Sequence, residues 1–394
     1  MEAKKEMQDK RVFKRKGWLV FMIAAMFCLV SHPVYGAEGE DSISLKDYDF
    51  SKIEEELKGE GEDIGFSFQE IVTCIMSGDI MGACKRVGQG FFNQIFQELL
   101  GNKKLMIQII CIVIFASIFM NFSHAFSGKH VGEAGFFVTY LILFTLLATS
   151  YGLGVSVTSQ IIRKLLEFMK VFIPTFCISI ATASGFTGST GIYSILMLAV
   201  MAADYLILTL LIPVVNLYFI LQMVDNLGKE SYFSKFAELV KKGCEWAMKT
   251  LFIGVAGVQV LQSLILPAID SVKGTVVQKG VSLIPGVGQA VSAVLSTMLG
   301  AGVIIKNSIG IAGLLCIIVF ISVPIIKLTV FFIGYQVLAA LLQPISDKRM
   351  MNCIQGTGEA VGLLLKIIWM VAGLFMVSLA LAAASTNAVY YSQT

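Results

Sequence analysis

Charged residues are scarce in this sequence. Asp, Glu, Lys and Arg make up 14% of its 394 residues, whereas hydrophobic residues make up 56%, and the mean hydropathy is +0.79. Soluble domains contain about 25% charged residues, so this composition excludes an ordinary soluble domain. The hydrophobic residues form long blocks, several of which reach the roughly 20 residues that cross a bilayer. The sequence therefore predicts an all-α, polytopic transmembrane helical bundle with interfacial amphipathic helices and a Gly-rich interrupted segment.

Residues that carry catalysis or bind metals are equally few. Histidine occurs three times, the eight cysteines form no CxxC or Cys/His cluster, and the common nucleotide-binding, zinc-protease and serine-hydrolase motifs are missing. We expect no enzyme activity, no cofactor and no metal site. The net charge of +3 gives no support for nucleic-acid binding. Cys74 and Cys84 are compatible with either a disulfide or two free thiols.

The first 104 residues differ from the rest. A stretch with seven Lys or Arg precedes thirteen apolar residues and SHPVYGA, which is typical of a signal peptide, although an uncleaved anchor has the same features. Residues 37–70 contain twelve Asp or Glu against three Lys, which favours an extracytoplasmic position. We therefore divide the chain into a signal peptide (1–36), an acidic extracytoplasmic segment with amphipathic helices (37–104), a transmembrane helical domain (105–385) and a polar tail (386–394).

The apolar blocks predict six or seven spans. A lysine-rich amphipathic helix at 230–249 is expected to face the cytoplasm. To place it there, residues 158–184 are predicted to form a re-entrant or interfacial hairpin, and a bend within 191–223 is the alternative. The main apolar blocks are 105–122, 134–157, 191–223, 250–269, 309–345 and 360–385.

Three charged residues fall inside these blocks: Asp204, Lys366 and Lys327, the last of which is discussed below. Charged side chains at membrane depth are rare and mark either an ion or proton pathway or a paired site, so Asp204 is a candidate for either role. Lys366 lies near the start of the last block, where we expect its long stem to carry the ammonium group to the lipid headgroups.

The Gly-rich segment 270–308 is the most irregular part of the apolar region. Its SLIPGVG motif places Pro285, Gly286 and Gly288 where an unbroken helix is not expected. Non-helical backbone at membrane depth is tolerated only where protein buries it or where it borders a water-filled cavity. The segment is therefore either a re-entrant element lining a pathway or a tightly packed hairpin.

Residues 323–349 combine two prolines with a lysine. Because proline suits the first turn of a helix, we expect a helix to begin near Pro324 and to end at about Gln343, before Pro344. Lys327 would then lie in that first turn, either reaching the headgroups or paired with Asp204. Both Pro324 and Lys327 are candidate pathway or packing residues.

Several motifs resemble a known family, the stage III sporulation protein AE family. They are GVQVLQS (257–263), SVKGTVVQKGVSLIPGVGQAVSAV (271–294), IIKNSIGIAGLL (304–315), VPIIKL (323–328) and AALLQPISD (339–347). The signal peptide, the acidic segment and the polytopic body of about 400 residues are also similar.

The resemblance implies a multi-pass protein of endospore-forming bacteria in the mother-cell membrane around the forespore. It implies a subunit of a secretion-like channel, a feeding tube needed for development after engulfment. The implied partners are a secretion-type ATPase, ring-forming proteins of the same operon and, across the intermembrane space, stage II sporulation protein Q. It supplies no catalytic or ligand-binding residues. A different hypothesis, based on the residues alone, is a secondary transporter or ion-pathway protein that uses Asp204 and the 270–308 segment.

Overall fold

The computed structural model describes residues 129–184, 186–228, 232–282, 288–344 and 346–393, with ten single residues between 69 and 118. All of these ranges belong to one unit of the chain, residues 45–394. The signal peptide, most of the acidic segment and most of the predicted span 105–122 lie outside the described residues, as do Cys74 and Cys84. Those expectations stay predictions.

The described ranges form helices joined by short connections. In chain order they are α5 (Lys129–Ser184), α6 (Phe186–Leu206), the π-helix η3 (Ile207–Leu211), α7 (Ile212–Asp225), α8 (Ser234–Ser282), α9 (Gly288–Leu342) and α10 (Lys348–Gln393). The described part of the chain contains no strand. The all-α prediction is confirmed.

Five helical runs are long and apolar enough to cross a membrane. They contain between 29 and 47 residues, more than the roughly 20 that one crossing requires. This confirms a polytopic helical bundle. The five runs are Gly135–Ala181, Gly191–Asp225, Ser234–Gln262, Ala301–Leu342 and Lys348–Ala384.

The predicted hairpin at 158–184 is wrong. This segment continues the helix of residues 134–157 without a break, so both belong to the 56-residue helix α5, with Pro174 inside it. Proline removes one backbone hydrogen bond, but a proline can persist in a membrane helix that neighbouring helices support. Phe172, Ile173 and Phe176 around the proline are fully buried, which shows that packing supports the helix there.

The predicted helix start near Pro324 is also wrong. Helix α9 runs through Pro324 from Gly288 to Leu342, so Lys327 lies well inside the helix and not in its first turn. Two residues before the proline, the Ser322 hydroxyl donates to the carbonyl oxygen of Val319 at 2.6 Å. The predicted end of this helix is confirmed, since α9 ends at Leu342, just before Pro344.

The block 191–223 is interrupted but not split. Between α6 and α7 lies the π-helix η3, where the backbone N–H of Ile212 donates to the carbonyl oxygen of Ile207. Pro213 follows directly, at the beginning of α7. A π-turn inserts one residue into the helical repeat.

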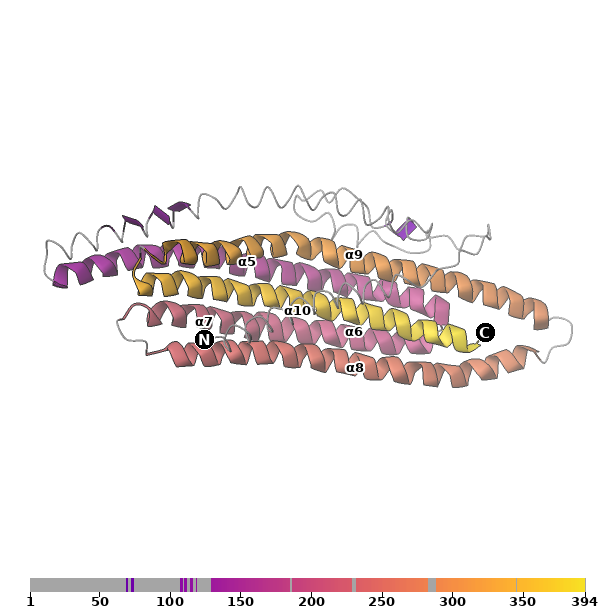
Figure 1. Ribbon diagram of the computed structural model, residues 1–394. Helices are drawn as coiled ribbons and strands as arrows, with labels where there is room; N and C mark the ends of the chain where they lie inside the picture. Colours follow the sequence, from indigo (N-terminus) through magenta and orange to yellow (C-terminus); the bar gives the residue numbers. More distant parts are fainter. Residues whose placement is uncertain are drawn as a thin grey trace, which may run out of the picture. The chain divides into compact units, whose positions relative to one another are not determined.

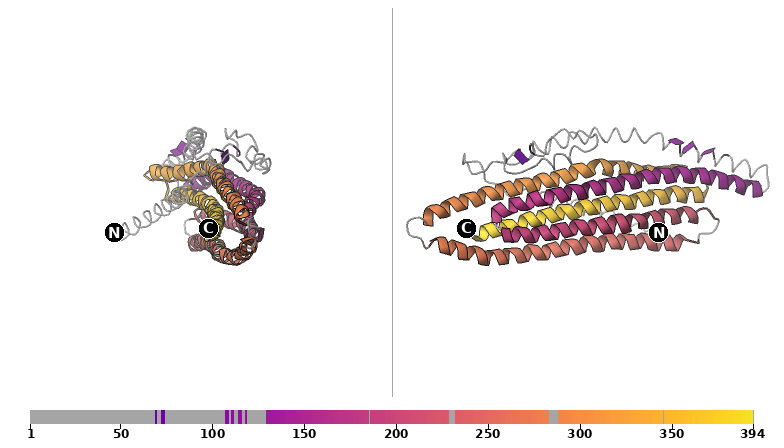
Figure 2. Two further views of the ribbon diagram at one scale, coloured as in Figure 1. Left: turned by 90° about the vertical axis from the view of Figure 1, so that its right-hand side faces the viewer. Right: turned by 180° about the vertical axis from the view of Figure 1, so that it is seen from behind.

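The long helices run side by side, and α10 packs against α5, α7, α8 and α9 (Figures 1 and 2). Helices α5 and α9 are antiparallel, because Ser150 contacts Tyr335 whereas Phe172, further along α5, contacts Gly313, which is earlier in α9. Helix α10 has the highest buried fraction among the five apolar runs. It therefore forms the centre of the packing.

One half of the α5–α9 interface consists of phenylalanine and glycine. Phe168, Phe172 and Phe176 are four residues apart, so they share one face of α5, and their neighbouring ring centroids lie 5.3 and 5.6 Å apart. The Phe172 ring packs onto Gly313 of α9, where an added Cβ would lie 2.3 Å from the ring. Phe320 of α9 meets Phe168 edge to face. Gly313 therefore allows the two helices to approach closely.

In the other half of the bundle, buried tyrosines connect α5 with α7 and with α9. Tyr140 of α5 donates to the Met223 carbonyl oxygen of α7 at 2.5 Å, and Tyr151 donates to Asn216 Oδ1 at 2.8 Å. Tyr335 of α9 shares a hydrogen bond with Ser150 of α5. Because hydroxyl groups buried in apolar surroundings need partners, these bonds fix how the helices are rotated.

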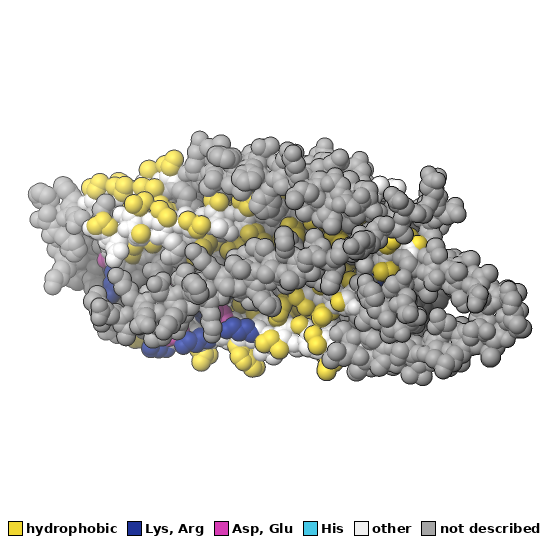
Figure 3. Space-filling model, turned by 45° about the vertical axis from the view of Figure 1, so that its right-hand side comes forward, with side chains coloured by type: hydrophobic (Ala, Val, Ile, Leu, Met, Phe, Trp, Pro, Cys, Tyr) yellow, Lys and Arg dark blue, Asp and Glu magenta, His cyan; other side chains and the backbone are white. Residues whose placement is uncertain are grey.

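The outer surface of the helices is largely apolar. Many large hydrophobic side chains are exposed on it, which suits contact with lipid acyl chains. Figure 3 shows such side chains next to a group of Lys and Arg side chains on the same face. Examples from α5, α6, α8 and α9 are Leu153, Met201, Ile253 and Leu341.

We predict that Gly313→Ala destabilises the protein. The new methyl group would collide with the Phe172 ring, which is fully buried between Phe168 and Phe176, and overpacking of this kind costs about 1–3 kcal/mol. Gly152→Ala on α5 is the control, because no atom lies within 4 Å of the position of its added Cβ. Thermal unfolding of the purified protein in lipid nanodiscs measures both. Equal melting temperatures for the two variants would contradict the close approach of α5 and α9.

Candidate functional site

Polar contacts follow the line along which α8 packs on α10. Three side chains of α8 each contact one side chain of α10. Lys241 pairs with Glu359, Glu245 pairs with Lys366, and Gln259 bonds to Ser378. Because the residue numbers rise together on the two helices, α8 and α10 are parallel. We call these six residues, together with Tyr218 of α7, the polar ladder.

Glu359 is bonded to two other helices. Its Oε2 atom accepts from Lys241 Nζ of α8 at 2.7 Å and from the Tyr218 hydroxyl of α7 at 2.8 Å. Lys241 also lies 6.0 Å from the centre of the Tyr218 ring, within the range of a cation–π contact. One carboxylate therefore connects α7, α8 and α10.

The second ion pair joins Lys366 to Glu245. Lys366 Nζ donates to Glu245 Oε1, and the side chains are 38% and 30% exposed. The ammonium group of Lys366 thus has a carboxylate partner on α8, and its reach to the lipid headgroups stays a prediction. Charged side chains at membrane depth usually pair with one another, as these two do.

The charges of α8 are divided between two faces. Lys241 and Glu245, four residues apart, face α10 and belong to the ladder. Lys235 and Lys242 face outward with side chains 94% and 73% exposed, and both lie near Glu238. Thus, in the helix predicted at 230–249, one charged face packs on α10 and the opposite charged face is exposed.

Every charge of the ladder is matched by an opposite one. Such an arrangement holds helices in register but provides no nucleophile beside a general base. Within the described ranges, no group of three or more His, Cys, Asp or Glu is placed to hold a metal ion. The polar ladder is therefore suited to holding α7, α8 and α10 in position.

The residues that the sequence singled out lie elsewhere. The backbone of Asp204 belongs to α6, three residues before η3, and its side chain is outside the described ones, so its pairing with Lys327 stays a prediction. Lys327 is half-buried in α9. Pro285 and Gly286 lie outside the described residues, between the end of α8 at Ser282 and the start of α9 at Gly288. The 270–308 segment therefore contains helix on both sides of residues 283–287, and its role in a pathway stays a prediction.

Sequence reasoning missed most of the ladder. Glu359 stands one residue before the predicted span 360–385, so it lies outside every predicted span. Tyr218 gives no polarity signal in a hydropathy profile. Gln259, together with Gln262, was detectable, because both glutamines interrupt the apolar stretch 250–269, and polar side chains there need partners.

The fold and the ladder define a class: an all-α, polytopic membrane bundle whose interhelical charges are paired. The sequence description of the stage III sporulation protein AE family matches residues 66–386, and the chain belongs to this family of sporulation proteins. The chain is similar to the stage III sporulation protein AE of Bacillus subtilis (strain 168), with 23% identity over 294 residues that cover 74% of this chain and 73% of the relative. No solved structure matches the chain.

We predict that Glu359→Gln destabilises the protein, because it leaves Lys241 without its carboxylate. Losing one partner costs about 3–5 kcal/mol in a fully buried pair and about 0–1 kcal/mol in an exposed pair. Since these side chains are 31% and 30% exposed, the loss should fall between the two. Glu238→Gln is the control, because its partner Lys242 is largely exposed.

The double variant Lys241→Glu/Glu359→Lys tests the pairing itself. It exchanges the two charges, so its melting temperature should exceed that of either single variant, as measured on purified protein in nanodiscs. Additive losses in the double variant would show that the two charges do not stabilise one another.

Proposed function

We propose that this protein is an integral membrane subunit of a channel complex that connects the mother cell with the forespore. It acts after engulfment, in the mother-cell membrane around the forespore, and the complex resembles a secretion system. In this role the protein is a fixed platform and not an enzyme. Membership of the sporulation family is the observation that carries the proposal.

The architecture supports a platform role. Five long apolar helices supply the membrane body, and α10 packs mainly against α5, α7, α8 and α9 in it. The polar ladder and the Phe172–Gly313 contact restrain sliding and rotation between them. A rigid helical body of this kind can hold partner subunits in one geometry while they assemble.

The proposed partners are a secretion-type ATPase and ring-forming proteins from the same operon. Stage II sporulation protein Q is the proposed partner on the forespore side of the intermembrane space. The acidic segment 37–70, predicted to be extracytoplasmic, is the part of this chain suited to contacts in that space. The charged outer face of α8, with Lys235 and Lys242, is suited to contacts on the other side of the membrane.

We predict that deleting the gene stops development after engulfment and that the wild-type gene restores spore formation. Heat-resistant spores are counted, and affinity-tagged protein from sporulating cells is tested for co-purification of the ATPase and the ring-forming proteins. A normal spore yield from the deletion strain would contradict a role in sporulation. A sporulation defect without co-purifying partners would contradict the channel-complex role alone.

The variants of the ladder connect this test to the structure. Lys241→Glu and Glu359→Lys should each lower the spore count, and the double variant should restore it in part. Membrane levels of each variant are measured by immunoblot, so that loss of the protein is separated from loss of its action. The double variant should restore the spore count only if Lys241 and Glu359 form their ion pair in the assembled protein, as they do in the structure.

A further inference from the structure

The outward face of α8 carries one line of side chains in which basic and large apolar residues alternate. Successive members are four or three residues apart, so they follow one another along the same face of the helix. The three lysines are exposed, and the three apolar side chains are between 65% and 70% exposed. We call these residues the mixed stripe; they are Lys235, Leu239, Lys242, Trp246, Lys249 and Ile253.

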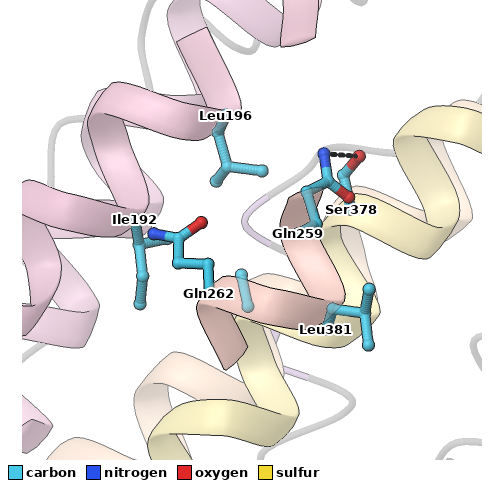
Figure 4. A pocket seen from close by; sticks show the side chains of 7 residues that line it. Ile192, Leu196, Gln259, Gln262, Ser378 and Leu381 are labelled. Carbon is cyan, nitrogen blue, oxygen red and sulfur yellow. Dashed lines mark hydrogen bonds between the residues drawn. The ribbon is translucent and has the colours of Figure 1, made fainter. Parts of the chain in front are cut away.

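The packed face of α8 lies on the other side of the helix. Ala237, Cys244 and Leu251 are buried. Each stands two residues after a lysine of the stripe, which is about 200° around a helix that turns by about 100° per residue. Farther along α8, Gln259 donates to the Ser378 oxygen of α10 at 2.7 Å, as Figure 4 shows. The mixed stripe therefore points away from the helices on which α8 packs.

The mixed stripe is positively charged. One acidic side chain lies beside it, because Glu238 accepts a hydrogen bond from Lys242 at 2.8 Å and lies 4.0 Å from Lys235. Ion pairs as exposed as these contribute little to stability, so both lysines remain able to exchange Glu238 for another carboxylate. Three lysines against one glutamate leave a surface that attracts an acidic partner.

Neither water nor lipid matches the whole stripe. Water suits its lysines but not Leu239, Trp246 and Ile253, whereas hydrocarbon has the opposite preference. The headgroup layer accepts both kinds of side chain, but it is only about 5–8 Å thick on each side of a bilayer. At 1.5 Å per residue the stripe extends for about 27 Å. Helix α8 does not lie flat in the headgroup layer, because it packs lengthwise on α10 within the bundle.

We propose that the mixed stripe binds an amphipathic helix of another protein, on which apolar side chains alternate with carboxylates. The alternating intervals of four and three residues give a repeat of 3.5, which keeps two helices in contact as they coil around one another. Leu239 and Trp246 supply the apolar contacts, and the lysines pair with the carboxylates.

Two acidic or helical segments of this chain do not fit the stripe. The α8 helix of a second, parallel copy would bring lysines against lysines, which is unfavourable. The acidic segment 37–70 is predicted to be extracytoplasmic, whereas the helix at 230–249 is predicted to face the cytoplasm. The occupant is therefore a different protein with an acidic helix.

Two synthetic helical peptides of equal length test the proposal. Both carry leucine in the seam positions, and one has glutamate where the other has lysine. The glutamate peptide should bind the full-length protein, in phosphatidylcholine nanodiscs, about tenfold more tightly than the lysine peptide, as measured by fluorescence anisotropy. Because purified protein is used, the result does not depend on the proposed channel role.

Charge variants show whether the stripe is the binding surface. Lys242→Glu/Lys249→Glu should reverse the preference between the two peptides. Arg163→Glu/Lys348→Glu makes the same change of charge at exposed positions of α5 and α10 and should keep the preference. No preference in the wild-type protein, or an equal loss in both variants, would overturn the proposal.

Leu239→Ser/Trp246→Ser tests the apolar half of the stripe. It keeps every charge but removes two exposed apolar side chains, so affinity for the glutamate peptide should fall by about tenfold. An unchanged affinity would mean that charge attraction alone holds the peptide, and the proposed helix packing would be wrong.

Other occupants of the stripe give different results. If anionic headgroups cover it, phosphatidylglycerol should raise the Tm of the wild-type protein but not of Lys242→Glu/Lys249→Glu. If a second copy covers it, light scattering should find a wild-type dimer that the same variant abolishes. Either result would overturn the proposal. Should that variant fail to fold, Lys242→Gln takes its place and should weaken binding of the glutamate peptide about threefold, and unchanged binding would again overturn the proposal.

Discussion

Pairing of charges between helices is the constraint on which the rest of this bundle depends. Glu359 lies in the helix with the highest buried fraction among the five apolar runs, and a carboxylate beside lipid is stable only when its charge is compensated. Lys241 and Tyr218 provide that compensation from two different helices. Their positions fix the register of α7 and α8 on α10. Helix α9 packs on α10, and α5 packs on both of them.

The contacts between helices differ along the bundle: one half has buried hydrogen bonds, and the other has close aromatic packing. In the half that contains Tyr140, Tyr151 and Tyr335, directional hydrogen bonds specify how each helix is rotated. In the half that contains Phe172 and Gly313, shape alone specifies the distance between helices. Hydrogen bonds in a membrane are directional but of modest strength, whereas close packing is strong but tolerates small rotations. Together the two kinds of contact specify one arrangement.

Composition was sufficient to predict the fold class, because apolar blocks of this length fit only membrane helices. The end of α9 before Pro344 was also predictable, since proline and a polar loop follow one another there. Pro324 was misread as a boundary, because local propensity gives proline a cost that neighbouring helices can offset. The ladder was largely unpredictable, since a single sequence does not show that Glu359 and Lys241, 118 positions apart, meet in space.

The lengths of the helices show why counting apolar blocks gave an unreliable topology. At 1.5 Å per residue, α5 and α9 are about 84 and 82 Å long, whereas the hydrocarbon layer is about 30 Å thick. Exposed Arg163 and Glu167 lie on α5 next to Phe168, which meets Phe320 in the apolar part of α9. A charged stretch of one helix is therefore level with an apolar stretch of another. Each helix must either tilt strongly or extend beyond the hydrocarbon, so the packed bundle as a whole, and not each block by itself, determines which residues meet lipid.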